Sequence, residues 1–467
     1  MNFKKDLPLT SSHWGTYRAK VKDGKVKELI GWENDKDPSP IGQGIVDVHN
    51  HQTRIDSPMI RKSWMDKGPG SNNSLRGTDP FISISWDEAE KIVSNELNRV
   101  KNDFGNASIF GGSYGWASAG RFHHAQSQLH RFLNCIGGYT RSKFTYSFAA
   151  AEAMVPHILG SYRAFLDTCT SWDSIEENTK LFICFGGVPL KNGQIAQGGT
   201  GSHKQKEKLI RSANAGIKFI NFSPLKSDLL DEVNGEWLAL RPNTDVAIML
   251  GLAHTLYKEK LYDDKFIEKY TEGFDTFLPY LLGDIDGIVK DANWASSISE
   301  IPSKKIISLA KEMSSKRTMI SVSWSLTRQD HGEQPFWAAI MLASMLGQIG
   351  LPGGGFGFGY SATNHIGGQF SIIPGAAFPQ TENKIEDFIP VARISDLLLN
   401  PGGSFDFDGK EYKYPDIKLI YWAGGNPFHH HQDINRLLQA WQKPETIISN
   451  EWCWNSLAKY SDIILSL

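Results

Sequence analysis

Ser147 is the residue whose surroundings first suggest chemistry, because it lies between two aromatic residues and three alanines follow them. Upstream, residues 110–120 read FGGSYGWASAG, a glycine-rich segment that also carries Tyr114 and Trp116. Glycine lets the backbone approach a ligand closely, and tyrosine and tryptophan each combine a flat apolar ring with a hydrogen-bond donor. A hydroxyl near such a loop could bind a ligand. An isolated serine at the start of a helix is otherwise most often an N-cap.

Three predicted strands end in turns rich in glycine, proline and asparagine, at residues 186–192, 222–224 and 424–427. Turns after strands often have this composition, so one alone is weak evidence for a ligand, and none matches the GxGxxG or P-loop pattern. Three in one chain favour a large nucleotide-like ligand. Backbone N–H groups at such turns favour a pyrophosphate, and Lys191 could supply a countercharge.

Three consecutive histidines occupy positions 429–431, and a pair occupies 123–124. Adjacent side chains point to different sides of a helix or a strand, so the three cannot all chelate one ion. We interpret the run as a polar loop beside a ligand or solvent, and we treat the pair with the same caution.

Composition limits the kinds of protein this chain can be. It has 467 residues, enough for more than one domain, and its 40% hydrophobic and 21% charged residues are ordinary for a globular protein. A net charge of −2 argues against a nucleic-acid partner. Its four cysteines form no CxxC pair, which argues against a disulfide framework or an iron–sulfur site.

The N-terminus and the hydropathy pattern indicate in which compartment the protein is expected. No stretch approaches the roughly 18 consecutive apolar residues of a transmembrane helix. The first residues lack both the apolar segment and the twin arginine of an export signal. We therefore expect a cytoplasmic protein without a membrane span.

Hydrophobic periodicity predicts the elements that position these residues. Residues 16–32 alternate in polarity around Asp23-Gly24, a dipeptide favoured by tight hairpins. Residues 83–105 predict a helix, because Ser85 and Glu88 form a capping box and apolar residues follow at helical spacing.

From about residue 155 to 350, short apolar runs alternate with helical patterns. Strands are predicted at 180–189, 216–224 and 318–326, helices at 245–259 and 335–350, and further strand-then-loop units at 416–427 and 445–452. This alternation predicts an α/β fold with parallel sheets and ligands at the carboxyl ends of the strands.

Five stretches resemble the molybdopterin oxidoreductase superfamily, in the branch of dimethyl sulfoxide, trimethylamine N-oxide and biotin sulfoxide reductases. They are GGSYGW at 111–116, YSFAAAEAMVPHILG at 146–160, PNTDVAIMLGLAHTL at 242–256, HGEQPFWAAIMLASMLGQIGLPGGGFG at 331–357 and WAGGNPFHHHQDINRL at 422–437. The similarity runs from His13 to the last residue. The missing export signal favours the biotin sulfoxide reductase type within that branch.

The resemblance implies a molybdenum ion held by two molybdopterin guanine dinucleotides and by one protein side chain, which maps onto Ser147. A serine alkoxide is a hard ligand suited to a high-valent metal. The implied reaction is reduction of an S-oxide or N-oxide, of the biotin sulfoxide, methionine sulfoxide or dimethyl sulfoxide class, by oxygen-atom transfer to Mo(IV). Because the chain has no iron–sulfur cysteines, the electrons are expected from a separate donor protein or reduced nicotinamide.

The resemblance also assigns roles to other residues. Tyr114 and Trp116 would face the metal, where the Tyr114 phenol could polarise a bound sulfoxide. The residues expected to bind the cofactor are Trp116, Lys191, Pro224, Asp245, Trp324, Arg328, Gly425, Asn426 and His430. Two positions depart from the family pattern. Ser223 replaces an Asp or Asn before Pro224, and Val188 replaces an Asn or Asp before Pro189.

The resemblance to this family also implies a multi-domain fold with Rossmann-like parallel-sheet domains. We expect a β-rich region at 1–60, a discontinuous α/β domain from 61–155 and 360–467, and a Rossmann-like domain at 156–359. Ser466 replaces the proline of a turn that the family continues through, so the chain is expected to be truncated before the family's C-terminal barrel.

Two other interpretations stay open. The chain could be an inactive remnant or N-terminal fragment that cannot retain the bis-pterin cofactor. It could also be a nicotinamide-dependent dehydrogenase with a doubly wound sheet, although the missing GxGxxG pattern disfavours that reading.

Overall fold

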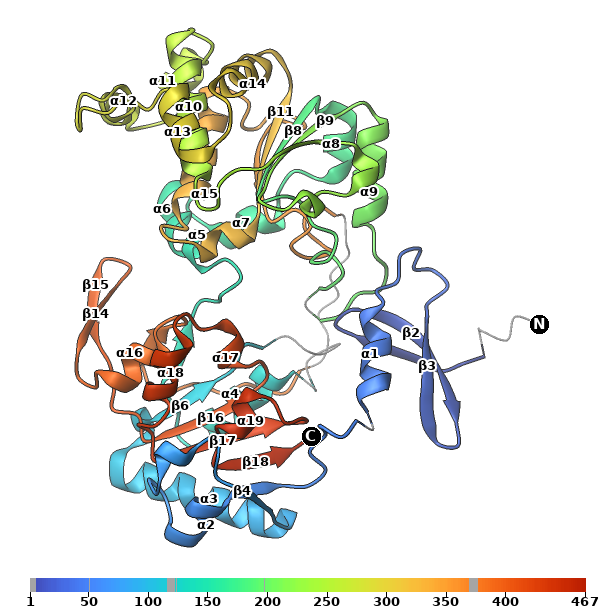
Figure 1. The fold of residues 1–467 in the computed structure, drawn as a ribbon, viewed down its shortest axis with the longest axis vertical. Coiled ribbons are helices and arrows are strands. Elements are labelled where there is room, and N and C mark those ends of the chain that lie inside the picture. The colour runs from blue at the N-terminus through green and yellow to red at the C-terminus, as the bar shows by residue number, and fades with distance from the viewer. Residues whose placement is uncertain (1–5, 50, 116–121, 123, 197, 369–376) are drawn as a thin grey trace.

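The computed structural model describes residues 6–49, 51–115, 122, 124–196, 198–368 and 377–467. These residues form a mixed α/β fold in which the longer sheets consist mainly of parallel strands. In Figure 1 a five-stranded sheet with its helices lies above a six-stranded sheet, and a small three-stranded sheet lies to one side of both.

The small sheet consists of antiparallel strands β1 (Leu9–Ser12), β2 (Gly15–Lys22) and β3 (Lys25–Gly31). The turn between β2 and β3 has positive φ angles at Asp23 and Gly24, of 52° and 71°. The hairpin predicted from this dipeptide is therefore confirmed. Helix α1 (Ile41–Val48) follows the sheet.

The five-stranded sheet is entirely parallel, as the alternation of strand and helix patterns predicted. Its strands, in spatial order, are β10 (Glu236–Leu238), β9 (Lys218–Phe222), β8 (Leu181–Phe185), β11 (Thr318–Val322) and β12 (Gly355–Phe358). All five residues of β8, Leu-Phe-Ile-Cys-Phe, are buried, which is the pattern of a strand covered on both faces.

Helices cover both faces of this sheet (Figure 1). One face packs against α10 (Asp245–Lys258), α14 (Ser303–Ser315) and α15 (Gln334–Met345), and the other against α8 (Trp172–Asn178) and α9 (Gln205–Asn214). The predicted helices at 245–259 and 335–350 correspond to α10 and α15.

The six-stranded sheet brings together residues from both ends of the chain. Its order is β5 (Phe81–Ser83), β4 (Met59–Arg61), β18 (Ile463–Ser466), β17 (Thr446–Glu451), β16 (Leu419–Ala423) and β6 (Ile109–Gly112). The last four are mutually parallel, and β4 and β5 are antiparallel additions. Helix α3 (Trp86–Phe104) packs here, and its capping box between Ser85 and Glu88 is present as predicted.

A buried ionic cluster fastens the last strands to the rest of this sheet. Asp462 is fully buried and accepts from Arg61 Nε at 2.7 Å and from Arg76 Nη2 at 2.5 Å. Its Oδ2 also accepts from the backbone N–H of Ile447 at 2.8 Å. Because all three donors are buried, this carboxylate is fully paired away from water.

The remaining elements are shorter or connect the sheets. The helices are α2 (Lys62–Lys67), α4 (Ala125–Cys135), α5 (Ala149–Met154), α6 (Pro156–Leu159), α7 (Tyr162–Asp167), α11 (Asp264–Tyr270), α12 (Phe274–Leu282), α13 (Ala292–Ser299), α16 (Ile394–Leu399), α17 (Pro427–His430), α18 (Ile434–Ala440) and α19 (Ser456–Lys459). The strands form two pairs, β7 (Arg141–Lys143) with β13 (Phe388–Pro390) and the hairpin β14 (Ser404–Phe407) with β15 (Lys410–Lys413). The 3-10 turns are η1 (Asn73–Leu75), η2 (Asn106–Ser108), η3 (Lys226–Asp228), η4 (Asp231–Val233) and η5 (Trp324–Arg328).

Within the described ranges, no helix combines the length and the apolar composition that crossing a bilayer requires.

Candidate functional site

Ser147 lies in a turn between β7 and α5, where the chain passes from the six-stranded sheet towards the five-stranded one. The turn begins at Phe144, whose φ of 67° is unusual for a bulky residue and marks a strained backbone. Ser147 is not the N-cap of α5, because Phe148 occupies that position. No hydrogen bond among the described residues uses the Ser147 hydroxyl, so the side chain stays available for a ligand.

Residues that follow β11 hold the backbone of this turn. Arg328 Nη1 donates to the carbonyl oxygens of Ser147 and Tyr146, at 3.2 and 3.4 Å. Thr327 Oγ1 donates to the Ser147 carbonyl at 3.4 Å. The carboxyl end of one sheet therefore fixes the backbone of Ser147 without engaging its side chain.

The ring of Tyr146, which precedes Ser147 in the turn, packs with two rings from other segments, Tyr114 and His430. The Tyr114 ring lies 5.5 Å from the Tyr146 ring and 4.6 Å from the His430 ring, measured between centroids. The hydroxyls of both tyrosines are buried, and neither makes a hydrogen bond of standard geometry with the described residues. Burial raises the pKa of Tyr146 to about 12 and holds that of Tyr114 well above its ordinary value of 10. Both phenols therefore stay protonated at neutral pH and can donate.

The turn after β16 holds Tyr114 in place. Tyr114 N–H donates to the carbonyl of Gly424 at 2.9 Å. Gly425 has a φ of 77°, and a Cβ there would lie 2.7 Å from the Cβ of Tyr114. Only glycine fits this position without displacing the tyrosine.

The side chain of Asn426 has one polar atom with a hydrogen-bond partner and one without. Its Oδ1 accepts from Phe428 N–H at 3.0 Å, its backbone oxygen accepts from His430 Nδ1 at 3.1 Å, and its buried Nδ2 has no partner among the described residues. A buried amide donor without a partner is a candidate contact for a ligand.

Lys191 and Pro224 lie at the carboxyl ends of β8 and β9, both exposed. Lys191 Nζ pairs with Asp228 Oδ1 at 3.2 Å. Ser223, the residue that departs from the family pattern, donates its hydroxyl to Asp228 Oδ2 at 2.7 Å. The second departure, Val188, is buried and donates its N–H to the Asp228 carbonyl at 2.8 Å.

Asp245 begins α10 and is 3% exposed. Its Oδ1 has no hydrogen-bond partner among the described residues. Burial raises the pKa of this carboxyl from 3.8 to about 6, a shift that Gln329, which neighbours Arg328, opposes by a hydrogen bond. An acceptor held in this way suits a ligand that presents N–H donors.

Glu451 is a residue that the sequence analysis missed. It is the last residue of β17, is 5% exposed, and accepts from Asn455 Nδ2 at 2.9 Å. Burial raises its pKa from 4.5 to about 7. Each of the two large sheets thus carries one buried acid of raised pKa near the ends of its strands. An acidic residue closing an apolar strand was the available signal.

Trp324 and Trp116 complete the set of predicted residues. Trp324 is 7% exposed and packs against Phe148 with ring centroids 4.5 Å apart, so it supports the residue that follows Ser147. Trp116 lies outside the described residues, as does His123 of the predicted histidine pair.

The three histidines were expected in a polar loop, but His429 and His430 belong to the short helix α17 and His431 directly follows it. His429 and His430 are exposed whereas His431 is buried. Within the part of the chain that the structure describes, no group of three or more His, Cys, Asp or Glu side chains is placed to hold a metal ion.

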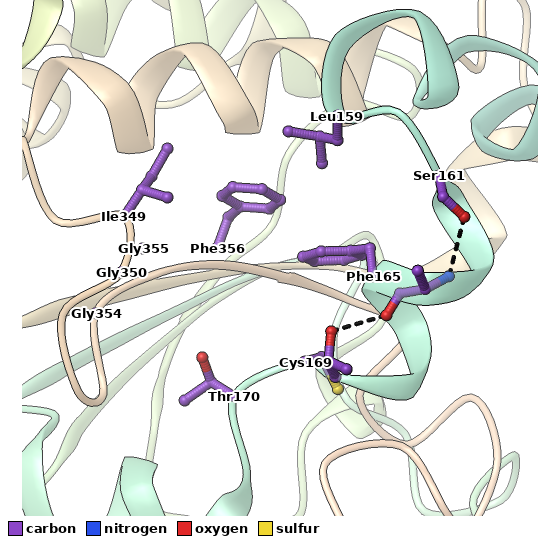
Figure 2. Close-up of a pocket in the computed structure, with 12 residues that line it drawn as sticks. Leu159, Ser161, Phe165, Cys169, Thr170, Ile349, Gly350, Gly354, Gly355 and Phe356 are labelled. Carbon is purple, nitrogen blue, oxygen red and sulfur yellow. Dashed lines mark hydrogen bonds between the residues drawn. The ribbon is translucent and has the colours of Figure 1, made fainter. Parts of the chain in front are cut away.

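A cavity of about 380 Å³ lies away from this cluster. Phe165 of α7 and Phe356 of β12 lie side by side in its wall (Figure 2). Gly354 and Gly355 line it where β12 begins, at the amino edge of the five-stranded sheet. It is thus separate from the strand ends that carry the predicted residues.

Comparison with known families and proteins gives consistent results. The model of the molybdopterin oxidoreductase family matches residues 54–465, and that of the molybdopterin oxidoreductase N-terminal domain matches residues 10–48. Among solved structures, the chain is similar to acetylene hydratase from Pelobacter acetylenicus, with a TM-score of 0.57 over 97% of this chain and 61% of that one. At 17% identity, this likeness concerns the fold alone.

Several curated proteins are similar over nearly the whole chain. A biotin sulfoxide reductase of Cereibacter sphaeroides is 45% identical over 92% of this chain and 58% of its own length. A dimethyl sulfoxide/trimethylamine N-oxide reductase of Rhodobacter capsulatus is 41% identical over 98% and 56%, and a trimethylamine-N-oxide reductase of Haemophilus influenzae is 40% identical over the same shares. The chain thus spans a little over half the length of these relatives. With a family model covering most of its residues, this chain belongs to the molybdopterin oxidoreductase family.

Proposed function

We propose that this chain provides the metal-binding part of an S-oxide or N-oxide reductase that uses a molybdenum bis(molybdopterin guanine dinucleotide) cofactor. The observation that carries the proposal is the position of Ser147, in a strained turn between β7 and α5, with its backbone bound and its hydroxyl free of described partners. The names of the similar reductases support the same reaction class.

The residues at the strand ends fit such a cofactor. Asp245 Oδ1 and Asn426 Nδ2 are buried polar atoms without partners, and Gly425 allows close approach of the backbone. A guanine presents adjacent N1–H and N2–H donors, which one ionised carboxylate can accept together. With Asp245 at one sheet and Glu451 at the other, each sheet would bind one dinucleotide.

Ser147 and Tyr114 would act next to the metal. When bound, the molybdenum supplies the two-electron chemistry that removes an oxygen atom from the substrate. Ser147 would contribute a hard oxygen ligand. Tyr114, whose burial keeps the phenol in its protonated form, would donate a hydrogen bond to the substrate oxide oxygen and polarise the bond that breaks. Tyr146 and His430 would keep that phenol oriented.

Two further parts of the proposal concern the electron donor and the division into domains. The four cysteines are unpaired and widely spaced, so electrons would come from a separate donor, either a protein or reduced nicotinamide. We also propose that residues 1–60, 61–155 with 360–467, and 156–359 are separate domains, because the three-, six- and five-stranded sheets fall in these ranges.

The proposal can be tested on the chain itself. After expression in a host that makes the cofactor, the purified protein should contain molybdenum and guanine nucleotide, measured by metal analysis and by chromatography of the extracted nucleotide. Ser147→Ala should lower the molybdenum content. Ser142→Ala, a change in the preceding strand, should leave it unaltered.

Reductase activity is measured with a reduced dye as electron donor. We expect oxidation of the dye with an S-oxide or N-oxide, and loss of that activity in Ser147→Ala. A metal content equal in wild type and Ser147→Ala would contradict the ligand assignment. Cofactor-free wild-type protein from a competent host would favour the remnant interpretation instead.

A further inference from the structure

Asp228 connects the turns that follow β8 and β9, although it belongs to no recognisable motif. Its Oδ1 pairs with Lys191 Nζ at 3.2 Å, and its Oδ2 accepts from the Ser223 hydroxyl at 2.7 Å. Its backbone carbonyl accepts from Val188 N–H at 2.8 Å. One acidic residue thus engages three donors that belong to two neighbouring strand-end turns.

The backbone brings Asp228 close to the first of these turns. Gly187 has a φ of 75°, and a Cβ there would lie 2.5 Å from the Cβ of Asp228. The close approach is possible only because position 187 is glycine. Asp228 is therefore held against the turn by its backbone, and the Ser223 hydroxyl gives its carboxylate a second partner besides Lys191.

The two partners differ in how firmly they are held. The Asp228 side chain is 13% exposed, whereas that of Lys191 is 63% exposed. A long, exposed lysine exchanges between acceptors at little cost, because an exposed ion pair is only weakly stabilising. A diphosphate with several anionic oxygens would compete well for the same ammonium.

We propose that Asp228 is an internal competitor of the diphosphate group. In the ligand-free protein its carboxylate holds Lys191, and a bound diphosphate takes the lysine over. Asp228 thereby orients Lys191 towards the strand-end turn and weakens anion binding at the same time. The inference rests on the proposed function, because it assumes that a dinucleotide binds at this edge.

Isothermal titration of the full chain with inorganic pyrophosphate, and separately with GDP, tests the inference. Asp228→Asn keeps the shape of the side chain and removes its charge, so pyrophosphate should bind more tightly, by up to about fivefold, the upper end of the range of an exposed ion pair. Asp231→Asn removes a charge from the neighbouring η4 turn without touching Lys191, and should leave binding unchanged. Thermal unfolding checks that each variant is folded.

The double variant separates competition from a general charge effect. Lys191→Met should weaken pyrophosphate binding, and adding Asp228→Asn to it should restore nothing. If the double variant gains as much as Asp228→Asn alone, the competition model is overturned. It is also overturned if Ser223→Ala, which removes only the Oδ2 contact, reproduces the gain, because the turn and not the lysine would then be responsible.

The remaining outcomes distinguish this inference from the proposed function. If wild type binds GDP and Asp228→Asn binds pyrophosphate no more tightly, the inference fails and the proposed function stands. If no variant binds either probe, including wild type, nucleotide binding at this edge is contradicted and the inference falls with it.

Discussion

Replacing Asp245 with asparagine should stabilise the ligand-free protein while weakening its binding of guanine nucleotides. Burial raises the pKa of this carboxyl from 3.8 to about 6. An acid with a higher pKa in the folded state binds more protons there than in the unfolded state, in the pH range between the two values. The free energy of unfolding should therefore fall as the pH rises from about 4 to about 6.

The magnitude follows from the two pKa values. A tenfold change in acidity corresponds to about 1.36 kcal/mol, so the difference between 3.8 and about 6 limits the effect to about 3 kcal/mol. This limit already includes the interaction of the ionised carboxylate with the start of α10, and asparagine has nearly the same shape as the protonated acid, so the variant should keep most of it. We expect a net gain of about 2 kcal/mol at pH 7.5 and almost none at pH 4.

Urea unfolding followed by circular dichroism, at pH 4 and pH 7.5, measures this gain. Asp264→Asn is the matched control, because Asp264 begins α11 as Asp245 begins α10 but is exposed. The control should show no gain at either pH. Titration with GDP should show weaker binding by Asp245→Asn only.

Two results would refute the reasoning. If Asp245→Asn is less stable than wild type at pH 7.5, the ionised carboxylate must be stabilised by its surroundings. If the variant gains equally at both pH values, the effect does not come from ionisation.

Three further predictions concern the same strand ends and the sheet behind them. GDP binding should weaken below about pH 7 as Glu451 takes up a proton, and Glu451→Gln should flatten that pH profile in calorimetric titrations. Gly425→Ala should lower the free energy of unfolding by about 1–3 kcal/mol, because it combines a positive φ with a Cβ only 2.7 Å from Tyr114, and chemical denaturation measures the loss. Asp462→Asn leaves two buried arginines underpaired and should cost about 3–5 kcal/mol, seen as a lower denaturation midpoint.

Local signals in the sequence predicted the regular elements well. The Asp23-Gly24 dipeptide marked the first hairpin, and the capping box marked the start of α3. Fully apolar runs such as residues 181–185 predicted buried parallel strands. These features depend on neighbouring residues, so a single sequence contains the information they need.

The contacts within the candidate site depend on tertiary packing, and the sequence could not reveal them. Arg328 was expected to contact the cofactor or substrate, and the structure uses one of its nitrogens to hold the backbone of Ser147. Glu451 escaped notice because its burial depends on β17 lying between β16 and β18. Asp228 follows no motif, and its importance comes from the turn opposite it.

The strand ends hold several features that destabilise the protein without a ligand. Phe144 has a strained backbone, and the carboxyls of Asp245 and Glu451 are buried with raised pKa values. Such features persist when function needs them and the rest of the fold can offset their cost. A ligand that accepts hydrogen bonds from the buried phenols and donates to the buried acids would relieve part of that cost and stabilise the folded state by mass action. Cofactor loading should therefore raise the thermal stability of this chain and release protons near neutral pH, two effects that a merely structural role for these residues would not produce.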